Sequence, residues 1–548
     1  DRRAGPGAAA GCAGGQGAAV ARARLMTPEL TTYHFADIWD AVAARVPHRT
    51  ALVADGERHT FAQLSDRVTR LAGWMWHAGV RQGDFVGLSL RNSSAFVEAT
   101  LAAFSLRAVP VNVHYHLQPA ELRHLLLDGP LVGVLHDPDV AQRLAAASVG
   151  CDALRWTLAT GAPYEAALTQ GAGIEVPRGP RPGDDPYVLY TGGTTGHPKG
   201  VVWQMQDAYF ACLGGGDPFG DRGPVTRPAD IVDRIGEPTV FLPVAPLVHA
   251  AGMWTTLRWL FAGSTVVLLP GFDPGAVWSA VMTEQVRVMN IVGDAMARPL
   301  LEAATDLTDP IPLRVLGSGG ATLSSETKRR LLALFPELTI KDTFGSSETG
   351  VQGWSVHRAG DSVDARFELV SSLVLNANTL EPLAPGAPET GIVARTGHVP
   401  LRYHRDPVAS ARTFREVGDT RYALTGDEGR VEADGSVLVL GRGSQCINTG
   451  GEKVFAEEVE ATMRAHHDVR DALVVGAPDK RWGQAVVALV EYVPGAVPDP
   501  EALRRFCRTH LAGFKVPKRV IGVPVIRRSP AGKPDYRWAA SVAVASGQ

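Results

Sequence analysis

Three stretches of the chain repeat a strand–helix–strand pattern with short polar links, and this pattern restricts the fold more than any other feature. They lie at residues 84–113, 265–292 and 313–341, the last with a helix expected at 325–334 and a strand at 338–341. In each, an apolar run is followed by a segment with helical spacing of apolar residues and then by a second apolar run. Parallel strands joined by crossover helices have this signature. The sequence therefore predicts an α/β fold built on parallel sheet.

The C-terminal part of the chain has a different pattern. Residues 422–441 are typical of two antiparallel strands around a turn at 433–435. The tail after a Gly-rich stretch is about a hundred residues long, enough for a separate small domain. We therefore expect a large α/β part at 26–444 and a small α+β domain at 445–548. A further helix is expected near the C-terminus, at 500–510.

Composition excludes several classes of protein. Apolar residues make up 45% and charged residues 20% of the 548 positions, which is ordinary globular usage. The net charge of −3 offers no general basic surface for nucleic acid, and no apolar run approaches the length of a bilayer span. The odd number of scattered cysteines favours reduced thiols in a cytoplasmic protein over a zinc site or disulfides. They are Cys12, Cys151, Cys212, Cys446 and Cys507.

Residues 1–25 differ from the rest because they are rich in Ala, Gly and Arg. They lack the apolar core of a secretory signal. We expect them to be a disordered extension, upstream of the fold or left over from production of the chain.

The densest chemical feature is the segment YTGGTTGHPKG at residues 190–200, which holds four glycines, three threonines and one lysine. Glycine lets backbone N–H groups approach an anion closely, and hydroxyl and ammonium groups add donors and charge. The segment lacks the Gly-Lys-Ser/Thr ending of a Walker A loop. A plain surface turn needs neither the lysine nor so many hydroxyls, so we interpret the segment as a polyphosphate-binding loop.

Two more segments follow predicted strands, GSGGA at 317–321 and DTFGSSETG at 342–350. Open α/β sheets bind ligands at the carboxyl ends of their strands. Phe344 is suited to stack on a base, and the Glu348 carboxylate is suited to bind a hard cation such as Mg²⁺. Taken alone, Phe344 is equally typical of a core and Glu348 of a solvated surface.

Three polar clusters lie nearer the C-terminus. TGD at 425–427, followed by GR at 441–442, offers a carboxylate of the kind that binds ribose hydroxyls. NTGGEKV at 448–454 and SPAGKP at 529–534 each display a lysine on a shaped loop, where an ammonium can cancel charge at a phosphoryl centre. Each cluster alone is explained as readily by an ordinary turn.

In their order and spacing, the five clusters resemble the core motifs of the adenylate-forming superfamily of acyl-CoA synthetases, adenylation domains and luciferases. The resemblance covers residues 31–538. It implies an N-terminal adenylation domain of stacked mixed sheets and helices, with a small β-rich subdomain, at 26–444, and a small mobile α+β C-terminal domain at 445–548. The strings GGGD at 214–217, IVGDA at 291–295 and CINTGGEK at 446–453 are most similar to actinobacterial acyl-CoA synthetases for steroid side-chain or terpenoid acids. The resemblance implies an AMP-forming ligase that uses ATP, Mg²⁺ and CoA, forming first an acyl-AMP and then an acyl-CoA thioester.

The resemblance also implies roles for individual residues. The β- and γ-phosphates would contact Thr191, Gly192, Gly193, Thr194, Thr195, Gly196 and Lys199. Adenine and ribose would contact Gly319, Gly320, Ala321, Asp342, Thr343, Phe344, Asp427 and Arg442. The catalytic set would be Ser347 at the α-phosphate, Glu348 on Mg²⁺, His249 bordering the acyl site, and Lys533 bridging carboxylate and α-phosphate.

The superfamily alternates between two domain orientations, and the resemblance implies the same here. Lys533 would leave after adenylation, and a face that shapes the CoA tunnel would arrive. That face comprises Gly450, Gly451, Glu452 and Lys453. The hinge position, usually Asp or Lys in the family, is Gln445. This departure bears on the charge-based interactions of the hinge.

The candidate acyl pocket is apolar or small in side chain. It comprises Trp203, Gly214, Gly215, Trp254, Gly293 and Val351. No Asp stands at 247–250, where amino-acid-activating relatives hold the substrate amine. Small residues beside aromatics predict a wide apolar pocket for a polycyclic terpenoid or steroid-type acid, although a flexible loop explains the glycines equally well. A medium- or long-chain fatty acid is the alternative substrate.

Two other functions stay open at this point. An acyl-AMP ligase would load a carrier protein instead of CoA, and a non-catalytic protein would only bind nucleotide or lipid. Lys533 and Glu348 argue against the second. The expected partners are a small carboxylic acid, ATP and CoA, without nucleic acid or a transmembrane segment, and a homodimer is left open.

Overall fold

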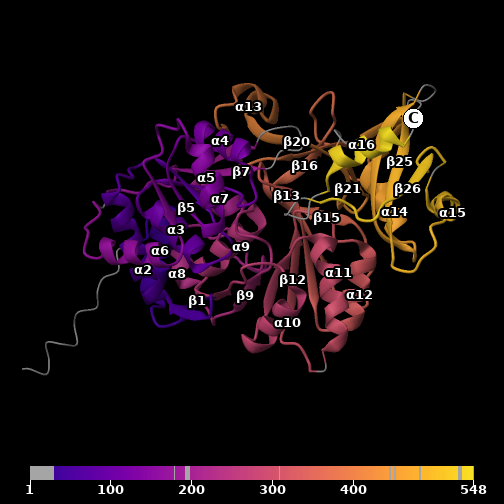
Figure 1. The fold of residues 1–548 in the computed structure, drawn as a ribbon. Helices are drawn as coiled ribbons and strands as arrows, with labels where there is room; N and C mark the ends of the chain where they lie inside the picture. Colours follow the sequence, from indigo (N-terminus) through magenta and orange to yellow (C-terminus); the bar gives the residue numbers. More distant parts are fainter. Residues whose placement is uncertain are drawn as a thin grey trace, which may run out of the picture.

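The computed structural model describes residues 30–546, apart from 178, 192–197, 308, 443–445, 450–451, 480–482, 512 and 529–533. Figure 1 shows the N-terminal elements on the left, a sheet with its helices in the centre and the C-terminal elements on the right. The expected extension at 1–25 lies outside the described residues.

A four-stranded parallel sheet forms the N-terminal layer, in the order β4 (Val109–Asn112), β3 (Phe85–Ser89), β5 (Leu131–His136) and β6 (Trp156–Ala159). The crossover helix α3 (Ser94–Ser105) buries every residue from 95 to 104 because it is covered on more than one side. The remaining helices of this layer are α1 (Phe35–Arg45), α2 (Phe61–His77), α4 (Pro119–Asp128), α5 (Ala141–Ser148) and α6 (Ala162–Gly171).

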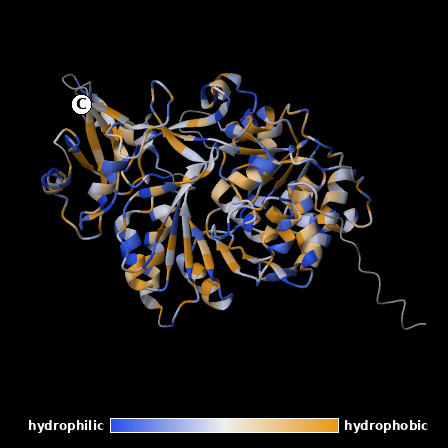
Figure 2. Ribbon diagram, turned by 180° about the vertical axis from the view of Figure 1, so that it is seen from behind, coloured by the Kyte–Doolittle hydropathy of each residue, from blue (hydrophilic) through white to orange (hydrophobic). Residues whose placement is uncertain are grey.

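A fourteen-stranded sheet forms the centre of the molecule. Its parallel part contains β1 (Thr50–Ala54), β9 (Val240–Pro243), β10 (Thr265–Val267), β11 (Val288–Ile291), β12 (Val315–Gly319) and β13 (Thr339–Ser346). β2 (Glu57–Thr60) is its antiparallel edge. Figure 2 shows orange, apolar residues along the strands of this sheet. They pack against helices α9 (Ala250–Phe261), α10 (Pro274–Thr283), α11 (Gly293–Ala303) and α12 (Ser325–Leu334).

After β13 the same sheet becomes antiparallel, and this part is the β-rich subdomain. It contains β14 (Gly350–His357), β15 (Arg366–Leu369), β16 (Ser372–Leu375), β17 (Gly391–Arg395), β19 (Phe414–Val417), β20 (Thr420–Val431) and β21 (Val437–Arg442). A separate three-stranded sheet contains β7 (Pro186–Thr191), β8 (Lys199–Gln204) and β18 (Arg402–Tyr403). Nearby lie α7 (Met205–Ala211), α8 (Asp230–Asp233) and α13 (Pro407–Thr413).

The C-terminal elements form a small α+β unit with its own core. Its sheet contains β22 (Cys446–Thr449), β23 (Glu452–Phe455), β24 (Val469–Asp479), β25 (Gly483–Tyr492) and β26 (Arg519–Gly522). Helices α14 (Ala456–Arg464), α15 (Pro500–His510) and α16 (Tyr536–Ala545) cover it. The predicted fold class is therefore confirmed: a large mixed α/β part, a β-rich subdomain and a small α+β part.

One sequence-based boundary was wrong in a way that matters for function. The strand predicted at 338–341 continues as β13 to Ser346, so Asp342 and Phe344 lie on the strand and not after it. Pairing with β12 on one side and β14 on the other supplies hydrogen bonds that hold this polar, Gly-containing segment extended. Within the described residues, no helix combines the length and the apolar character that crossing a bilayer requires.

Candidate active site

The expected phosphate loop joins β7 to β8, and the structure describes its two ends. Thr191 and Lys199 face each other across the antiparallel pair. Residues 192–197, which include the predicted phosphate-binding residues Gly192, Gly193, Thr194, Thr195 and Gly196, lie outside the described residues. Asn112 fixes the start of the loop, since its amide accepts from Tyr190 N and donates to Tyr190 O, each at 2.8 Å.

Lys199, at the end of this loop, is held by an ion pair. Its Nζ lies 2.9 Å from Oδ2 of Asp406 and 5.3 Å from the centre of the Tyr403 ring. About a third of each partner's side chain is exposed, so the ammonium remains accessible to an anion. The two contacts come from β18 and the segment that follows it, which are therefore part of the candidate site.

Glu348 lies in the turn between β13 and β14 and faces the same segment. Tyr403 donates from its hydroxyl to Oε1 of Glu348 at 3.0 Å. The carboxylate is half-buried, and no other side-chain hydrogen bond to it is found among the described residues. An oriented carboxylate with a free oxygen, linked through Tyr403 to Lys199, fits Mg²⁺, which usually takes one or two carboxylates together with substrate phosphates.

The turn that carries Ser347 and Glu348 is closely packed. Thr349 Oγ1 accepts from Ser346 N at 2.9 Å, and Trp203 Nε1 donates to Ser347 O at 3.0 Å. A side chain at Gly345 would collide with the carbonyl of Gly350, so two glycines permit the hairpin. Because Trp203 is fully buried on β8, this contact links the turn rigidly to the strand that begins at Lys199.

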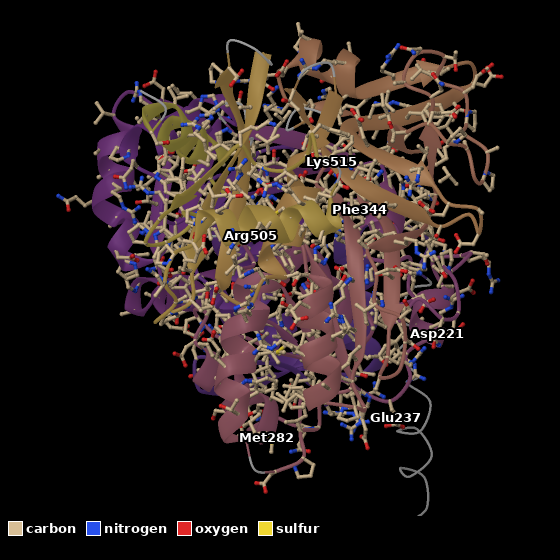
Figure 3. The ribbon with its side chains drawn as sticks, turned by 90° about the vertical axis from the view of Figure 1, so that its right-hand side faces the viewer. Asp221, Glu237, Met282, Phe344, Arg505 and Lys515 are labelled. Atoms are coloured by element: carbon tan, nitrogen blue, oxygen red, sulfur yellow. The ribbon has the colours of Figure 1, made fainter. Side chains whose placement is uncertain are left out.

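The expected adenine residues lie at adjacent strand ends. Gly319 on β12 is paired in register with Thr343 on β13, and Gly320 turns away with a φ of 82°. A Cβ at Gly320 would meet nothing within 4 Å, while Ala321 follows half-buried. Phe344 is half-buried against Phe367, with ring centres 5.7 Å apart. It is labelled in Figure 3, which views the molecule from the C-terminal side.

Asp342 has a partner that the sequence interpretation did not include. Its Oδ2 lies 2.6 Å from Nζ of Lys328 on α12, and both side chains are buried. Burial raises the pKa of Asp342, and the Lys328 ammonium opposes that rise. Lys328 also contacts Nε2 of His357 at 3.4 Å. The pair anchors α12 to β13, beside the expected adenine site.

Asp427 lies on β20 in register with Arg442 on β21. Asp427 is buried and accepts a short hydrogen bond from the hydroxyl of Thr425. The end of the Arg442 side chain is outside the described part of the structure. Glu457, on α14 of the C-terminal part, approaches Gly441 so closely that a Cβ there would force the Glu457 carboxylate to shift. Burial, with Glu460 and Asp427 nearby, raises the pKa of Glu457 to about 7.

His249 caps the N-terminus of α9 and faces His114, which follows β4. The two ring centres are 5.2 Å apart. Nδ1 of His114 accepts from His116 N at 3.2 Å, and its Nε2 is buried without a hydrogen bond among the described residues. Burial lowers the pKa of His114 to about 4, with a smaller effect from His116, so the ring is neutral at pH 7.

The expected acyl-pocket residues are close-packed. Trp254 donates from Nε1 to Tyr187 Oη at 3.1 Å, and Val351 is half-buried on β14. Gly214 and Gly215 have φ values of 79° and 59°, and their Cβ positions would face Arg258 and Phe210. Gly293, with a φ of 52°, lies against the carbonyl of Thr322. The three glycines therefore permit backbone shapes and close approaches that other residues resist.

Several expected site residues cannot be placed. Lys533, Gln445, Gly450 and Gly451 lie outside the described residues, as do the loop residues 192–197. Glu452 and Lys453 begin β23, and only their backbone is described. The domain boundary expected at 443–445 lies outside as well.

Sequence reasoning missed Tyr403, Asp406, Lys328 and His114. Each contacts a motif residue from outside the motif itself; Tyr403 and Glu348, for example, are 55 residues apart. None of the four belongs to a motif of fixed spacing. The sequence offers only a weak signal for such residues, a polar residue among apolar neighbours. That signal does not indicate which residue the polar side chain contacts.

Comparison with known proteins places these motifs in a family. The family model for the AMP-binding enzyme matches residues 39–403, and the model for the AMP-binding enzyme C-terminal domain matches residues 458–533.

Two relatives and one solved structure show how far the similarity extends. A medium/long-chain-fatty-acid–CoA/3-oxocholest-4-en-26-oate–CoA ligase of Mycolicibacterium smegmatis is 39% identical, over 93% of this chain and 96% of its own length. A 3-oxocholest-4-en-26-oate–CoA ligase of Rhodococcus rhodochrous is 38% identical, over 92% and 95%. The crystal structure of ATP-bound MatB from Rhodopseudomonas palustris shares the fold, with a TM-score of 0.77 and 24% identity over 92% of this chain and 98% of that one.

Proposed function

Since the chain belongs to the AMP-binding enzyme family, we propose that it is an ATP-dependent acyl-CoA ligase for a bulky hydrophobic carboxylic acid. Relatives at 38–39% identity that cover more than nine-tenths of the chain are named as CoA ligases, which supports this activity. Their printed substrates, a steroid side-chain acid and medium- or long-chain fatty acids, support the proposed class of acid.

One observation of the structure carries the proposal: the phosphate-loop strand and the β13–β14 turn are tied together by side chains. Trp203 on β8 holds Ser347, and Tyr403 orients Glu348 while its ring lies under Lys199. Cation, carboxylate and hydroxyl groups thus converge where a triphosphate and an acid can meet. Catalysis by position and charge neutralisation needs such a fixed arrangement.

The proposed chemistry has two steps. In the first, a carboxylate oxygen of the acid attacks the α-phosphorus of ATP, and the bond to the bridging oxygen breaks to release pyrophosphate. In the second, the CoA sulfur attacks the acyl carbon of the acyl-AMP, the bond to the AMP oxygen breaks, and the thiol proton passes to solvent. Activation is required because an unmodified carboxylate is a poor electrophile with no good leaving group.

We propose roles for the motif residues. Thr191 and Lys199 hold the terminal phosphates, together with Gly192, Gly193, Thr194, Thr195 and Gly196 of the loop between them. Ser347 contacts the α-phosphate, and Glu348 would hold Mg²⁺, which would supply charge neutralisation between phosphate oxygens. Ribose is assigned to Asp427 and Arg442, and adenine to the β12 and β13 strand ends around Phe344.

The C-terminal part supplies the remaining groups. We infer that Lys533 bridges the acid and the α-phosphate in the first step, and that rotation about Gln445 then brings Gly450, Gly451, Glu452 and Lys453 to the CoA tunnel. The division at 444/445 fits the gap between the two family matches, which end at 403 and begin at 458. A cytoplasmic location, expected from reduced thiols, stays a prediction; Cys151, Cys212 and Cys507 are free and buried.

The proposal is tested with a panel of carboxylic acids, MgATP and CoA, with pyrophosphate release as the rate and mass spectrometry of the product. We expect polycyclic acids to give the highest kcat/KM and a CoA thioester as product. If linear acids turn over faster, the substrate is a fatty acid and not a polycyclic acid. If product forms only with a holo carrier protein, the acceptor is that carrier protein and not CoA.

A further inference from the structure

A buried lysine that belongs to no motif lies behind the expected adenine site. Lys328, on α12, has 2% of its side chain exposed, and its Nζ lies 2.6 Å from Oδ2 of Asp342 on β13. Its Nζ also lies 3.4 Å from Nε2 of His357, which in turn contacts Oγ of Ser355 at 3.0 Å. Replacing a buried ion pair by apolar residues is often neutral or stabilising, so the pair is better explained by a role than by stability.

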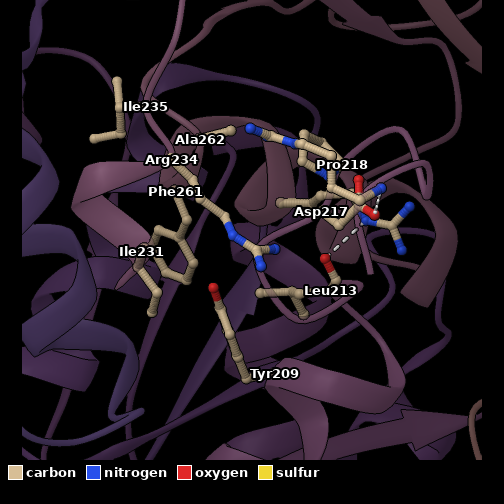
Figure 4. Close-up of a pocket in the computed structure, with 12 residues that line it drawn as sticks. Tyr209, Leu213, Asp217, Pro218, Ile231, Arg234, Ile235, Phe261 and Ala262 are labelled. Carbon is tan, nitrogen blue, oxygen red and sulfur yellow. Dashed lines mark hydrogen bonds between the residues drawn. The ribbon is translucent and has the colours of Figure 1, made fainter. Parts of the chain in front are cut away.

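A second buried carboxylate, Asp217, shows how a purely structural one is held. It is labelled in Figure 4 and accepts from the backbone N–H groups of residues 220, 222 and 223 at 2.7–2.8 Å. Burial opposes its ionisation, but these backbone groups hold its pKa below the ordinary value. Asp342 instead has the Lys328 ammonium and the backbone N–H of Thr343. A carboxylate offers about four acceptor positions, so these two donors leave Asp342 able to accept more.

Asp342 lies where a base is expected to bind. It is two residues before Phe344, so the alternation of side chains along β13 places both on one face of the sheet. On the neighbouring strand β12, Gly319 and Gly320 follow the residue paired with Asp342, and a Cβ at Gly320 would meet nothing within 4 Å. The Asp342 side chain is 8% exposed, against 2% for Lys328. A ligand can therefore reach the carboxylate more readily than the ammonium.

The protonation state of Asp342 decides which base it can pair with. An ionised carboxylate only accepts hydrogen bonds, whereas a protonated one also donates. Adenine presents an amine at C6, which donates, and guanine presents a carbonyl there, which accepts. Burial raises the pKa of Asp342, the Lys328 ammonium opposes that rise, and Asp294 on α11 adds to it. Burial, with Lys328 nearby, lowers the pKa of His357, so that ring is neutral at pH 7.

We propose that Lys328 is a positioning residue that sets the choice of nucleotide: it holds Asp342 ionised and oriented so that one oxygen accepts from the amine of adenine. The inference rests on the proposed function, because it takes ATP as the nucleotide bound beside Phe344. Lys328 does not touch the nucleotide and acts only through Asp342. A site built to pair with one polar group of its substrate rejects analogues that lack it, because its own polar group is then left unpaired.

The test replaces ATP by two triphosphates that differ from it at the C6 edge of the purine. Inosine triphosphate carries a carbonyl there, and purine riboside triphosphate carries only hydrogen. Pyrophosphate release with one saturating acid gives kcat/KM for each nucleotide. With the unsubstituted enzyme, we expect ATP to exceed purine riboside triphosphate by about tenfold and inosine triphosphate by at least about 10²-fold.

Two variants separate the carboxylate from the lysine that orients it. In Asp342→Asn, the ammonium of Lys328 attracts the amide oxygen and leaves the amide nitrogen to donate to the base. The ratio of ATP to inosine triphosphate should therefore fall by at least about tenfold, while KM for the acid stays within about twofold. In Lys328→Met/Asp342→Asn the amide is no longer oriented, so the ratio should fall clearly less.

Lys341→Met is the matched control. This lysine lies on the opposite face of β13, where its Nζ donates to Phe219 O at 2.7 Å and lies 4.4 Å from the centre of the Trp354 ring. The variant should keep the nucleotide ratio of the unsubstituted enzyme.

Three results would overturn the role of Lys328 and leave the ligase activity standing. They are a ratio near one in the unsubstituted enzyme, a ratio that no substitution changes, and equal ratios in the single and double Asp342→Asn variants. If no acid releases pyrophosphate from ATP with the unsubstituted enzyme, the proposed function fails before this inference is reached.

Discussion

The β13–β14 turn and the contact between α14 and β21 meet the same expected nucleotide site in opposite ways. At the turn, Ser347 and Glu348 each have an uncharged hydrogen-bond partner from another strand. At the contact, Glu457 is pressed against Gly441 with Asp427 close by, and its Oε2 has no partner among the described residues. The first arrangement is built to stay fixed. The second holds a carboxylate in an unfavourable place, as we expect of a surface that separates in the proposed domain alternation.

The largest effect should come from removing the buried ion pair between Lys328 and Asp342, which anchors β13. Lys328→Met leaves Asp342 buried without its cation, and loss of one partner of a buried pair costs about 3–5 kcal/mol of unfolding free energy. Urea unfolding of wild type and variant measures this loss of unfolding free energy. The double variant Lys328→Met/Asp342→Asn should recover part of the loss. Equal stability of wild type and single variant would show that the pair does not anchor β13.

Lys533→Ala tests the C-terminal part, which we propose to rotate between the two steps. Removing a charge that acts on the α-phosphate should slow acyl-AMP formation by about 10²–10³-fold, the usual cost of losing one preorganised charge-stabilising group. Thioester formation from preformed acyl-AMP should change little, because the proposed lysine has left by then. Similar losses in both half-reactions would contradict domain alternation.

Glu348→Gln tests whether the carboxylate in the β13–β14 turn holds Mg²⁺. The amide keeps the size and the hydrogen bond from Tyr403 but loses the charge that would attract Mg²⁺. We expect adenylation to slow by about 10–100-fold and the Mg²⁺ concentration for half-maximal rate to rise. An unchanged Mg²⁺ dependence would remove the metal role from Glu348.

Glu457→Gln tests the contact through pH. The folded protein holds a proton on Glu457 up to a pKa of about 7, against an ordinary value of 4.5. Stability from this group is therefore complete below pH 4.5 and declines as pH rises to about 7. Relative to wild type, the Gln variant should gain stability between pH 5 and pH 8, by at least about tenfold in the folding equilibrium. Glu458→Gln, whose parent pairs with Lys515, should show no such gain.

Tyr403→Phe should have the smallest effect. It removes one hydrogen bond of about 1 kcal/mol to Glu348 and keeps the ring under Lys199, so adenylation should slow about five-fold. The effect should disappear in a Glu348→Gln background if Tyr403 works only by orienting the carboxylate. Additive losses in the double variant would assign Tyr403 a separate role.

Local pattern predicted most of the fold. Helices expected at 325–334 and 500–510 begin and end at those residues, because clear apolar periodicity and capping residues define them. The extension of β13 to Ser346 was not predictable, since a polar segment with glycine becomes a strand only when β12 and β14 pair with it.

The candidate site was predictable only as far as motifs reach. Ser347, Glu348 and Lys199 belong to strings of recognisable spacing, whereas Tyr403, Asp406 and Lys328 join them through the tertiary fold. The glycines at 214–216 show the same limit. Their positive φ values show that they are needed for the backbone conformation. The prediction from side-chain volume alone did not include this role.

The most direct test of the central claim is isotope exchange between pyrophosphate and ATP in the absence of CoA. With a polycyclic acid and Mg²⁺, we predict acid-dependent exchange, followed by AMP and acyl-CoA in equal amounts once CoA is added. Exchange absent for every acid tried, while the protein remains folded, would contradict the account.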